Sequence, residues 1–299
     1  MKTTRFSGHY GFNLLRMALI FILIIVLVPM LWFSDRQAQA YLHPFRGLAS
    51  SDLLRAQDIQ YRDIELHTRD GVTLSAWYVP PVNGAVILLA HGYGSARTAD
   101  MTALFADHGF GVLAWDFRAH GKSGGDFSTL GYYEQFDMEA ALDYALHQPG
   151  VKHVGAWGGS MGGATVILTA ARHPGIEAVV SDSAFPTLVD AFKYNAPFPV
   201  FQQLIRFFAE LQTGISMDKV RPVDEIGKIS PRPVFIIDGW DGSAIAMNAP
   251  YLLYAAARQP KQLWVEDGVP HLEMYAMYKE QYTQKVIGFF ETYLLGWSG

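Results

Sequence analysis

Short apolar runs, separated by polar or amphipathic stretches, recur along most of this chain. Eight such runs carry apolar side chains continuously or at alternate positions; they cover residues 60–66, 73–79, 85–90, 111–115, 153–157, 178–181, 234–237 and 262–265. Their lengths are typical of β-strands. The first two runs alternate and flank Arg69, Asp70 and Gly71, a turn signal that predicts an antiparallel hairpin.

Stretches of helical period lie between most of the later runs. They cover residues 96–108, 134–147, 249–257 and 278–295. Strands that alternate with helices at this spacing predict a mostly parallel sheet with helices on both faces. Because ligands bind at the carboxyl ends of the strands in such sheets, we expect the chemistry in the loops that follow the strands.

Residues 185–230 interrupt this alternation. They are rich in proline and aromatic side chains, and they contain one amphipathic stretch of helical period at 200–211. We expect this segment to form a cap inserted over the site. Packing in the core is the alternative role for its aromatic side chains.

A longer apolar run lies near the N-terminus. It begins at Met17, ends at Phe33 and contains no charged residue, and Leu14 and Leu15 extend it if the Arg16 side chain reaches back to the interface. The run approaches the roughly 20 residues that span a bilayer, so it predicts a helix that contacts the lipid membrane.

The charges that flank this run indicate its orientation. Lys2, Arg5 and Arg16 precede it, whereas Asp35 and Arg36 follow it and cancel. The positive-inside rule then places the N-terminus in the cytoplasm. The large domain would lie on the other side of the membrane, which is periplasmic or extracellular in a bacterium.

A cleaved signal peptide is the alternative interpretation of the same run. Ala38-Gln39-Ala40 resembles a signal-peptidase site, and cleavage after Ala40 would release a secreted domain. The length of the run and its distance from that site favour an uncleaved anchor. We therefore divide the chain into a tip and anchor (1–40), a connector (41–58) and an α/β domain (59–299) that includes the cap.

Composition excludes several classes of function. The net charge of -5 and a pI near 6.0 provide no broad basic surface, so nucleic acid is not an expected partner. The absence of cysteine excludes thiolate metal sites, disulfides and cysteine nucleophiles. The 10 histidines lack His-Glu-x-x-His or a comparable ligand spacing, so neither a metal nor another cofactor is expected.

The most informative motif is Gly158-Gly159-Ser160-Met161-Gly162-Gly163, which joins the run at 153–157 to an apolar helical stretch at 164–171. A serine at such a strand-to-helix turn has a strained backbone and needs glycines two positions before and after it. Its hydroxyl is then exposed at the carboxyl end of the sheet. The amide of Met161, at the start of the helix, would face a developing oxyanion.

Two further segments are predicted at the same edge of the sheet. His91-Gly92-Tyr93-Gly94 follows the run at 85–90, and the amide of Tyr93 would be a second oxyanion donor. His271 lies in the loop after the run at 262–265. A serine, an acid and a histidine in this chain order are typical of α/β-hydrolases.

From about residue 59 to its C-terminus the sequence resembles the α/β-hydrolase superfamily, most closely its bacterial membrane-anchored members related to the serine aminopeptidase S33 or hydrolase-4 group. The resemblance rests on HGYGS at 91–95, DFRAHGKSGG at 116–125, the motif around Ser160, VSDS at 180–183, and His271 followed by Tyr275. It implies the α/β-hydrolase fold with an eight-stranded, mostly parallel sheet. It does not imply a substrate, because the superfamily contains esterases, lipases, thioesterases and peptidases.

The resemblance also implies roles for individual residues. These are Ser160 as nucleophile, His271 as general base and later acid, and the amides of Tyr93 and Met161 as the oxyanion hole. A serine hydroxyl is weakly acidic, so the histidine must lie within hydrogen-bond reach and a carboxylate must hold its tautomer. His91 and His120 belong to structural turns in this family, so neither is expected to be the base.

The acid departs from the family pattern. Family members place it three residues after the glycine that follows the seventh strand, where the sequence Gly239-Trp240-Asp241-Gly242 has a glycine. Asp241, one residue early, is the expected acid if the glycines of this loop let its backbone shift. Asp182, at the end of the preceding strand, is the alternative, although an aspartate there coexists with the usual acid in the nearest relatives.

These features predict a serine hydrolase that cleaves small-molecule carboxylic esters or thioesters through an acyl-enzyme, with an apolar acyl group. One alternative is a catalytically weak relative that acts as a membrane-tethered binding protein, because the acid is displaced. Another is an aminopeptidase-like peptidase, which needs a carboxylate in the cap to bind the substrate's ammonium group. The candidates are Asp190, Glu210, Asp218, Asp224 and Glu225.

Overall fold

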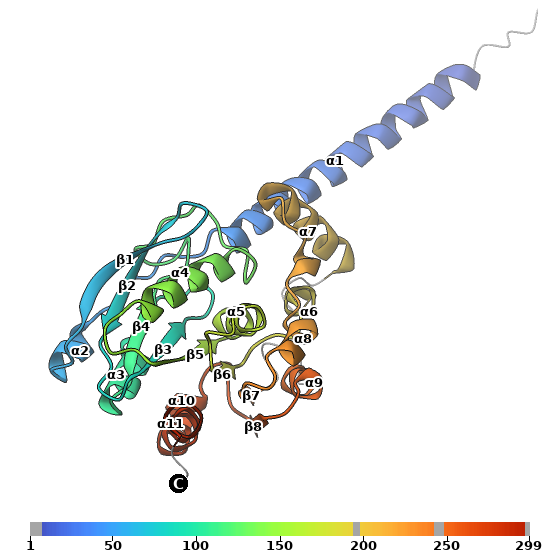
Figure 1. Cartoon of the computed structure of the whole chain (residues 1–299). Helices are drawn as coiled ribbons and strands as arrows, with labels where there is room; N and C mark the ends of the chain where they lie inside the picture. Colours follow the sequence, from blue (N-terminus) through green and yellow to red (C-terminus); the bar gives the residue numbers. More distant parts are fainter. Residues whose placement is uncertain (1–7, 194–197, 242–247, 297–299) are drawn as a thin grey trace, which may run out of the picture.

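A computed structural model describes residues 8–193, 198–241 and 248–296 (Figure 1). Its centre is an eight-stranded sheet in the order β1-β2-β4-β3-β5-β6-β7-β8. The strands are β1 (Arg62–His67), β2 (Thr73–Val79), β3 (Ala85–Ala90), β4 (Gly111–Trp115), β5 (His153–Gly159), β6 (Ala178–Asp182), β7 (Val234–Trp240) and β8 (Lys261–Asp267). β2 pairs antiparallel with β1 and β4, and all other pairs are parallel, which confirms the predicted mostly parallel sheet.

Helices cover both faces of this sheet. They are α3 (Ala99–Asp107), α4 (Glu134–Leu146), α5 (Met161–Ala170), α9 (Ala249–Ala256), α10 (Met274–Met277) and α11 (Lys279–Leu295). Along β3 the side chains of Val86 and Leu88 pack into a core with α4 and α5, whereas Ile87 and Leu89 pack into a core with α3 and α11. Successive strand residues point to opposite faces, so a continuous apolar run is required when both faces are covered.

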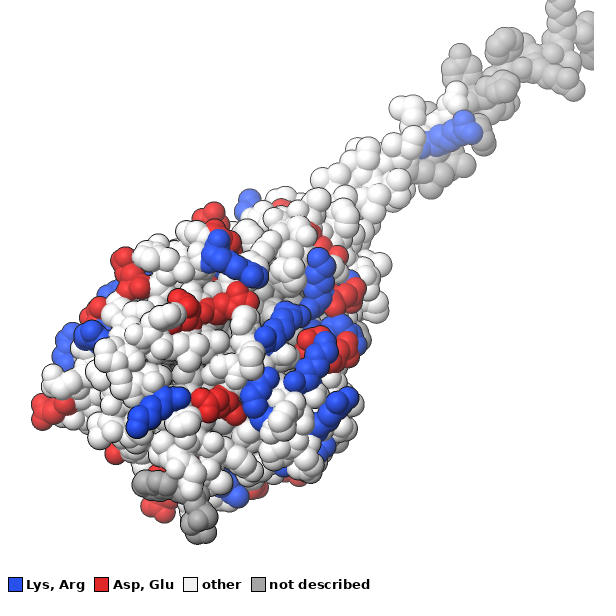
Figure 2. Space-filling view, viewed as in Figure 1, with Lys and Arg blue, Asp and Glu red and all other residues white. Residues whose placement is uncertain are grey.

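The long N-terminal helix α1 (Gly8–Leu42) has two different surroundings. Its apolar part protrudes from the domain as a rod without charges up to a basic group near its far end (Figures 1 and 2). Its last two turns pack against the domain, where Ala38 and Leu42 are buried. The segment Arg16–Leu42 is long and apolar enough to cross a membrane.

The helix α1 therefore continues beyond residue 40 into the segment that the sequence suggested as a connector. The rest of that segment contains the short helix α2 (Asp52–Ala56), whose Leu54 is buried with Trp77 and Ala103. Leu48 and Phe45 of the intervening segment are exposed. Residues 41–58 are thus partly folded onto the domain.

The interruption at residues 185–230 folds into short helices on the α1 side of the sheet (Figure 1). They are α6 (Leu188–Lys193), α7 (Pro199–Thr213), α8 (Pro222–Glu225) and the 3-10 turns η1 (Met217–Lys219) and η2 (Ile226–Lys228). Phe185, Phe192 and Ile205 of this cap share a core with Ala38 and Leu42 of α1. Some of the aromatic side chains of the cap are therefore core residues, and the cap and α1 stabilise each other.

Candidate active site

Ser160 occupies the sharp turn between β5 and α5. Its φ of 53° and ψ of -115° lie in a region that costs a residue with a side chain about 1–3 kcal/mol. Gly158 and Gly162 make the turn possible, since a Cβ on Gly158 would overlap the backbone of Gly162, and a Cβ on Gly162 would overlap the backbone of Ala90. The Ser160 amide donates to the carbonyl of Asp182 at 2.8 Å, which ties the strained turn to β6.

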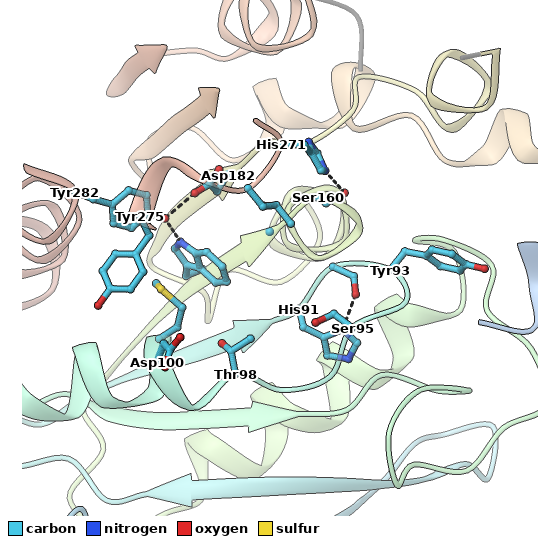
Figure 3. A pocket seen from close by; sticks show the side chains of 15 residues that line it. His91, Tyr93, Ser95, Thr98, Asp100, Ser160, Asp182, His271, Tyr275 and Tyr282 are labelled. Atoms are coloured by element: carbon cyan, nitrogen blue, oxygen red, sulfur yellow. Dashed lines mark hydrogen bonds between the residues drawn. The ribbon is translucent and has the colours of Figure 1, made fainter. Parts of the chain in front are cut away.

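His271 lies in the loop after β8 and points at the serine (Figure 3). Its Nε2 is 2.9 Å from the Oγ of Ser160. Burial lowers the pKa of His271, and the negative charge of Asp241 acts in the opposite direction. The imidazole is therefore neutral at pH 7, so its Nε2 can accept the hydroxyl proton of Ser160.

Asp241 follows directly after the end of β7, and its side chain is exposed. It is the carboxylate whose charge favours the protonated form of His271. Gly242, one of the two glycines that would let this loop shift, lies outside the described residues.

Asp182 has other partners. Its Oδ2 accepts a hydrogen bond from the Tyr282 hydroxyl at 2.7 Å and its Oδ1 accepts one from Ser183 at 2.8 Å. Burial raises the pKa of Asp182 to about 6. Within the described ranges no hydrogen bond joins Asp182 to His271. The carboxylate of Asp182 is thus held by Tyr282 and Ser183.

The predicted oxyanion donors, Tyr93 and Met161, flank Ser160. Met161 is the first residue of α5, so its amide is among the N–H groups that have no acceptor within the helix. Tyr93 lies in the loop after β3 and lines the same pocket as Ser160. In the part of the chain that the structure describes, the Tyr93 amide donates to no protein acceptor.

Two buried histidines hold the loop that carries Tyr93. The Nε2 of His91 accepts from the Phe117 amide at 2.9 Å, and the Nε2 of His120 accepts from the Gly94 amide at 3.1 Å. Burial lowers the pKa of both rings, to about 3 for His91. Both are neutral acceptors for backbone amides, as expected for residues of structural turns.

A pocket of about 250 Å³ opens beside the Ser160 hydroxyl (Figure 3). Its wall is mainly apolar and aromatic, and it includes Met101, Trp157, Leu272, Tyr275 and Tyr282. Among the described residues that line it, the carboxylates are the buried Asp182 and the exposed Asp100. The cap carboxylates considered as ammonium ligands do not line it; they are Asp190, Glu210, Asp218, Asp224 and Glu225.

Two features of the site have no signal in the sequence. The first is the bonding of Tyr282, which accepts from the Trp157 indole at 2.8 Å while it donates to Asp182. The second is the Tyr93 hydroxyl, which donates to the carbonyls of Ala40 at 3.1 Å and Tyr41 at 2.8 Å at the end of α1. These partners are far apart in sequence, and no local pattern connects them.

The sheet order, the strained serine between β5 and α5, and the histidine after β8 together define an α/β-hydrolase. Comparison with known proteins agrees. A sequence profile of the family Hydrolase_4, described as "Serine aminopeptidase, S33", matches residues 82–221. The chain belongs to the α/β-hydrolase superfamily.

Relatives of similar length occur in bacteria. Uncharacterized protein YqkD of Bacillus subtilis is 27% identical over 233 residues, which cover 74% of this chain and 76% of that protein. Uncharacterized protein YfhR of Salmonella typhi is 26% identical over 299 residues, covering 92% of this chain and 95% of the relative. The second likeness extends over nearly the whole of both chains.

Among solved structures, an esterase of Pyrococcus furiosus, Pf2001, is similar to this chain. The TM-score is 0.72 with 25% identity, and the match covers 85% of this chain and 98% of the esterase. The family profile and this neighbour support a hydrolase of the esterase kind.

Proposed function

We propose that this protein is a serine hydrolase that cleaves carboxylic esters or thioesters with a compact apolar acyl group. The observation that carries the proposal is the 2.9 Å distance between Ser160 Oγ and His271 Nε2, at a strained turn that faces a pocket. A neutral histidine at this distance is what a serine hydroxyl needs to become a nucleophile.

The geometry supports a double displacement. The Oγ of Ser160 attacks the acyl carbon while His271 takes the hydroxyl proton, and the amides of Tyr93 and Met161 stabilise the oxyanion. The carbon–oxygen or carbon–sulfur bond breaks, and His271 gives the proton to the leaving alcohol or thiol. A water then attacks the acyl-enzyme, its proton passes through His271 to Ser160, and a carboxylic acid leaves.

The pocket supports the choice of acyl group. Its volume of about 250 Å³ lies below the roughly 300–1,000 Å³ of typical ligand pockets. Trp157, Leu272 and Met101 provide apolar contacts. The described residues that line the pocket include no lysine or arginine that could pair with a charged substrate. A short acyl chain or a single ring fits these walls better than a long or charged group.

The two alternative functions have less support. A catalytically weak binding protein would not require the strain at Ser160 or its contact with His271. A peptidase that binds an N-terminal ammonium group needs a pocket carboxylate, and the cap carboxylates are paired elsewhere, as in the bonds of Arg206 to Glu210 and of Lys228 to Glu225. Asp100 is the exposed pocket carboxylate that could take that role.

We also propose that α1 remains uncleaved and anchors the domain to the membrane, with the N-terminus in the cytoplasm. A cut after Ala40 would divide α1 at residues that belong to the folded domain, because Ala38 is fully buried and the Ala40 carbonyl accepts from Tyr93. A reporter fused to the C-terminus should be active only on the non-cytoplasmic side, and cytoplasmic activity would contradict the proposed topology.

Labelling of the purified full chain with a fluorophosphonate probe tests the proposed function. The wild type should react and Ser160→Ala should not, and p-nitrophenyl acetate and butyrate should compete better than the decanoate ester. His271→Ala serves as a matched variant that keeps the serine but should lose its reactivity. A folded wild type that remains unlabelled would refute the proposal.

A further inference from the structure

The cap helix α7 presents three distinct faces. Its first face is buried, since Ile205 and Ala209 are only 3% and 2% exposed and pack in the same core as Ala38 and Leu42 of α1. This contact fixes the position of α7 relative to the end of α1. Figure 1 shows α7 lying across α1 where α1 leaves the domain.

The second face of α7 is polar and turns toward the domain. Arg206 bonds to Glu210 at 2.8 Å and to Asp218 of the following turn. Glu210 accepts from the Ser216 hydroxyl at 3.0 Å and from the Met217 amide at 2.9 Å. These bonds prevent α7 from rolling about its axis, so its remaining face has a defined direction.

The third face is apolar and exposed. Val200, Phe207 and Leu211 are 57%, 56% and 66% exposed, and Leu204 lies between them in the same stripe. Their spacing places them on one side of a helix. Phe198, just before α7, is 62% exposed and extends the apolar surface. Apolar surface left uncovered in this arrangement marks a site of interaction.

This apolar surface is continuous with the apolar part of α1. The ring of Phe201 lies 5.6 Å from that of Phe33 on α1 and 6.5 Å from that of Phe198. The exposed face of α7 and the protruding part of α1 are therefore joined by aromatic contacts. A single apolar phase can therefore cover both the exposed face of α7 and the protruding part of α1.

The contacts between the two helices also show at which residues of α1 the helix α7 crosses it. Phe201, near the start of α7, contacts Phe33, and Gln212, near its end, donates to Asp35 at 2.9 Å. The apolar run of α1 ends at these residues, where Trp32 is exposed and the Arg36 guanidinium lies 5.7 Å from its ring. An exposed tryptophan beside a cation at the end of a membrane helix is typical of the membrane–water interface.

We infer that α7 and Phe198 form a second membrane-binding element, with α7 lying in the plane of the bilayer interface beside α1. Helices of this kind bury their apolar face about 5–10 Å deep at the boundary between headgroups and acyl chains. The occupant is the lipid bilayer, because the stripe is continuous with α1 and lies where its apolar run ends. This inference rests on the proposed anchoring by α1.

The absence of cysteine allows a direct test in the full chain. Single-cysteine variants Phe207→Cys and Leu211→Cys, labelled with an environment-sensitive fluorophore, are reconstituted into phosphatidylcholine vesicles with or without spin-labelled phosphatidylcholine. Val28→Cys on α1 reports on the anchor. Leu146→Cys, 50% exposed on α4 at the opposite end of the strands from Ser160, is the matched control.

The expected result is strong quenching by the spin-labelled lipid at positions 28, 207 and 211, and none at position 146. Quenching at 28 without quenching at 207 and 211 overturns the inference and leaves the anchor intact. No quenching at 28, 207 or 211 overturns both. Blue-shifted emission at 207 without lipid quenching means that protein covers the stripe, and this also overturns the inference.

Discussion

Substitution of Leu42 by alanine tests whether the end of α1 is part of the folded domain. Leu42 is 3% exposed and packs with cap residues that include Leu188 and Met217. Its carbonyl accepts from the Ser128 amide at 2.8 Å. The substitution removes side-chain contacts and leaves the backbone bond in place, so it isolates the packing contribution of this residue.

The expected loss of stability follows from burial. Replacing a buried leucine by alanine costs about 2–5 kcal/mol, and the range depends on how well the site can collapse. The core around Leu42 is held by α1, α6 and α7, which limits collapse, so we expect about 3 kcal/mol. In a domain of this size each kcal/mol shifts Tm by roughly 2–4 °C, so Tm should fall by roughly 6–12 °C.

Thermal unfolding of the full chain in detergent, followed by circular dichroism, measures this shift. Leu31→Ala is the matched control, because Leu31 is 39% exposed on the protruding part of the same helix. Its Tm should stay close to that of the wild type. Equal Tm values for Leu42→Ala and Leu31→Ala would show that α1 is not docked, and cleavage after Ala40 would again be compatible with a stable domain.

The other predictions concern the site. Ser160→Ala should abolish ester turnover without loss of the fold, and residual turnover near that of the wild type would refute the nucleophile. Asp241→Asn should lower kcat by up to roughly 10⁴-fold, as removal of an orienting acid can, and Asp182→Asn far less; the reverse order would make Asp182 the acid. Tyr93→Phe should lower kcat more than it raises KM, because the loop that carries the proposed oxyanion amide loses its hydrogen bonds to α1. As pH rises from about 4 to 6, the unfolded chain ionises Asp182 while the folded chain keeps it protonated, so stability should fall in the wild type and fall less in Asp182→Asn.

The elements of the fold could be predicted from the sequence because their causes are local. A run such as 85–90 is apolar at every position, and at a length of six residues this pattern is typical of a strand covered on both faces. The turn at Ser160 could be predicted for the same reason, since Gly158 and Gly162 occupy positions where a Cβ would overlap the backbone. The membrane helix could likewise be predicted from the length and composition of the apolar run at 17–33 alone.

The arrangement around the histidine could not be derived in this way. Asp182 is the last residue of β6 and Asp241 directly follows β7, so their sequence positions do not distinguish them. Their hydrogen-bond partners distinguish them. The hydroxyl of Tyr282, 100 positions further along the chain, donates to Asp182. Such a partner is selected by the packing of α11 on the sheet, which brings distant residues into hydrogen-bond range.

The residue at which α1 ends is also decided by contacts with distant parts of the chain. Residues 34–39 are mostly polar, which by itself marks the end of a membrane helix at Phe33. The helix continues to Leu42 because Ala38 and Leu42 are buried against the cap and the Tyr93 hydroxyl shares its proton between two carbonyls of its last turn. Composition determines which segments can enter a bilayer, whereas the packing of distant side chains decides where such a segment joins the domain.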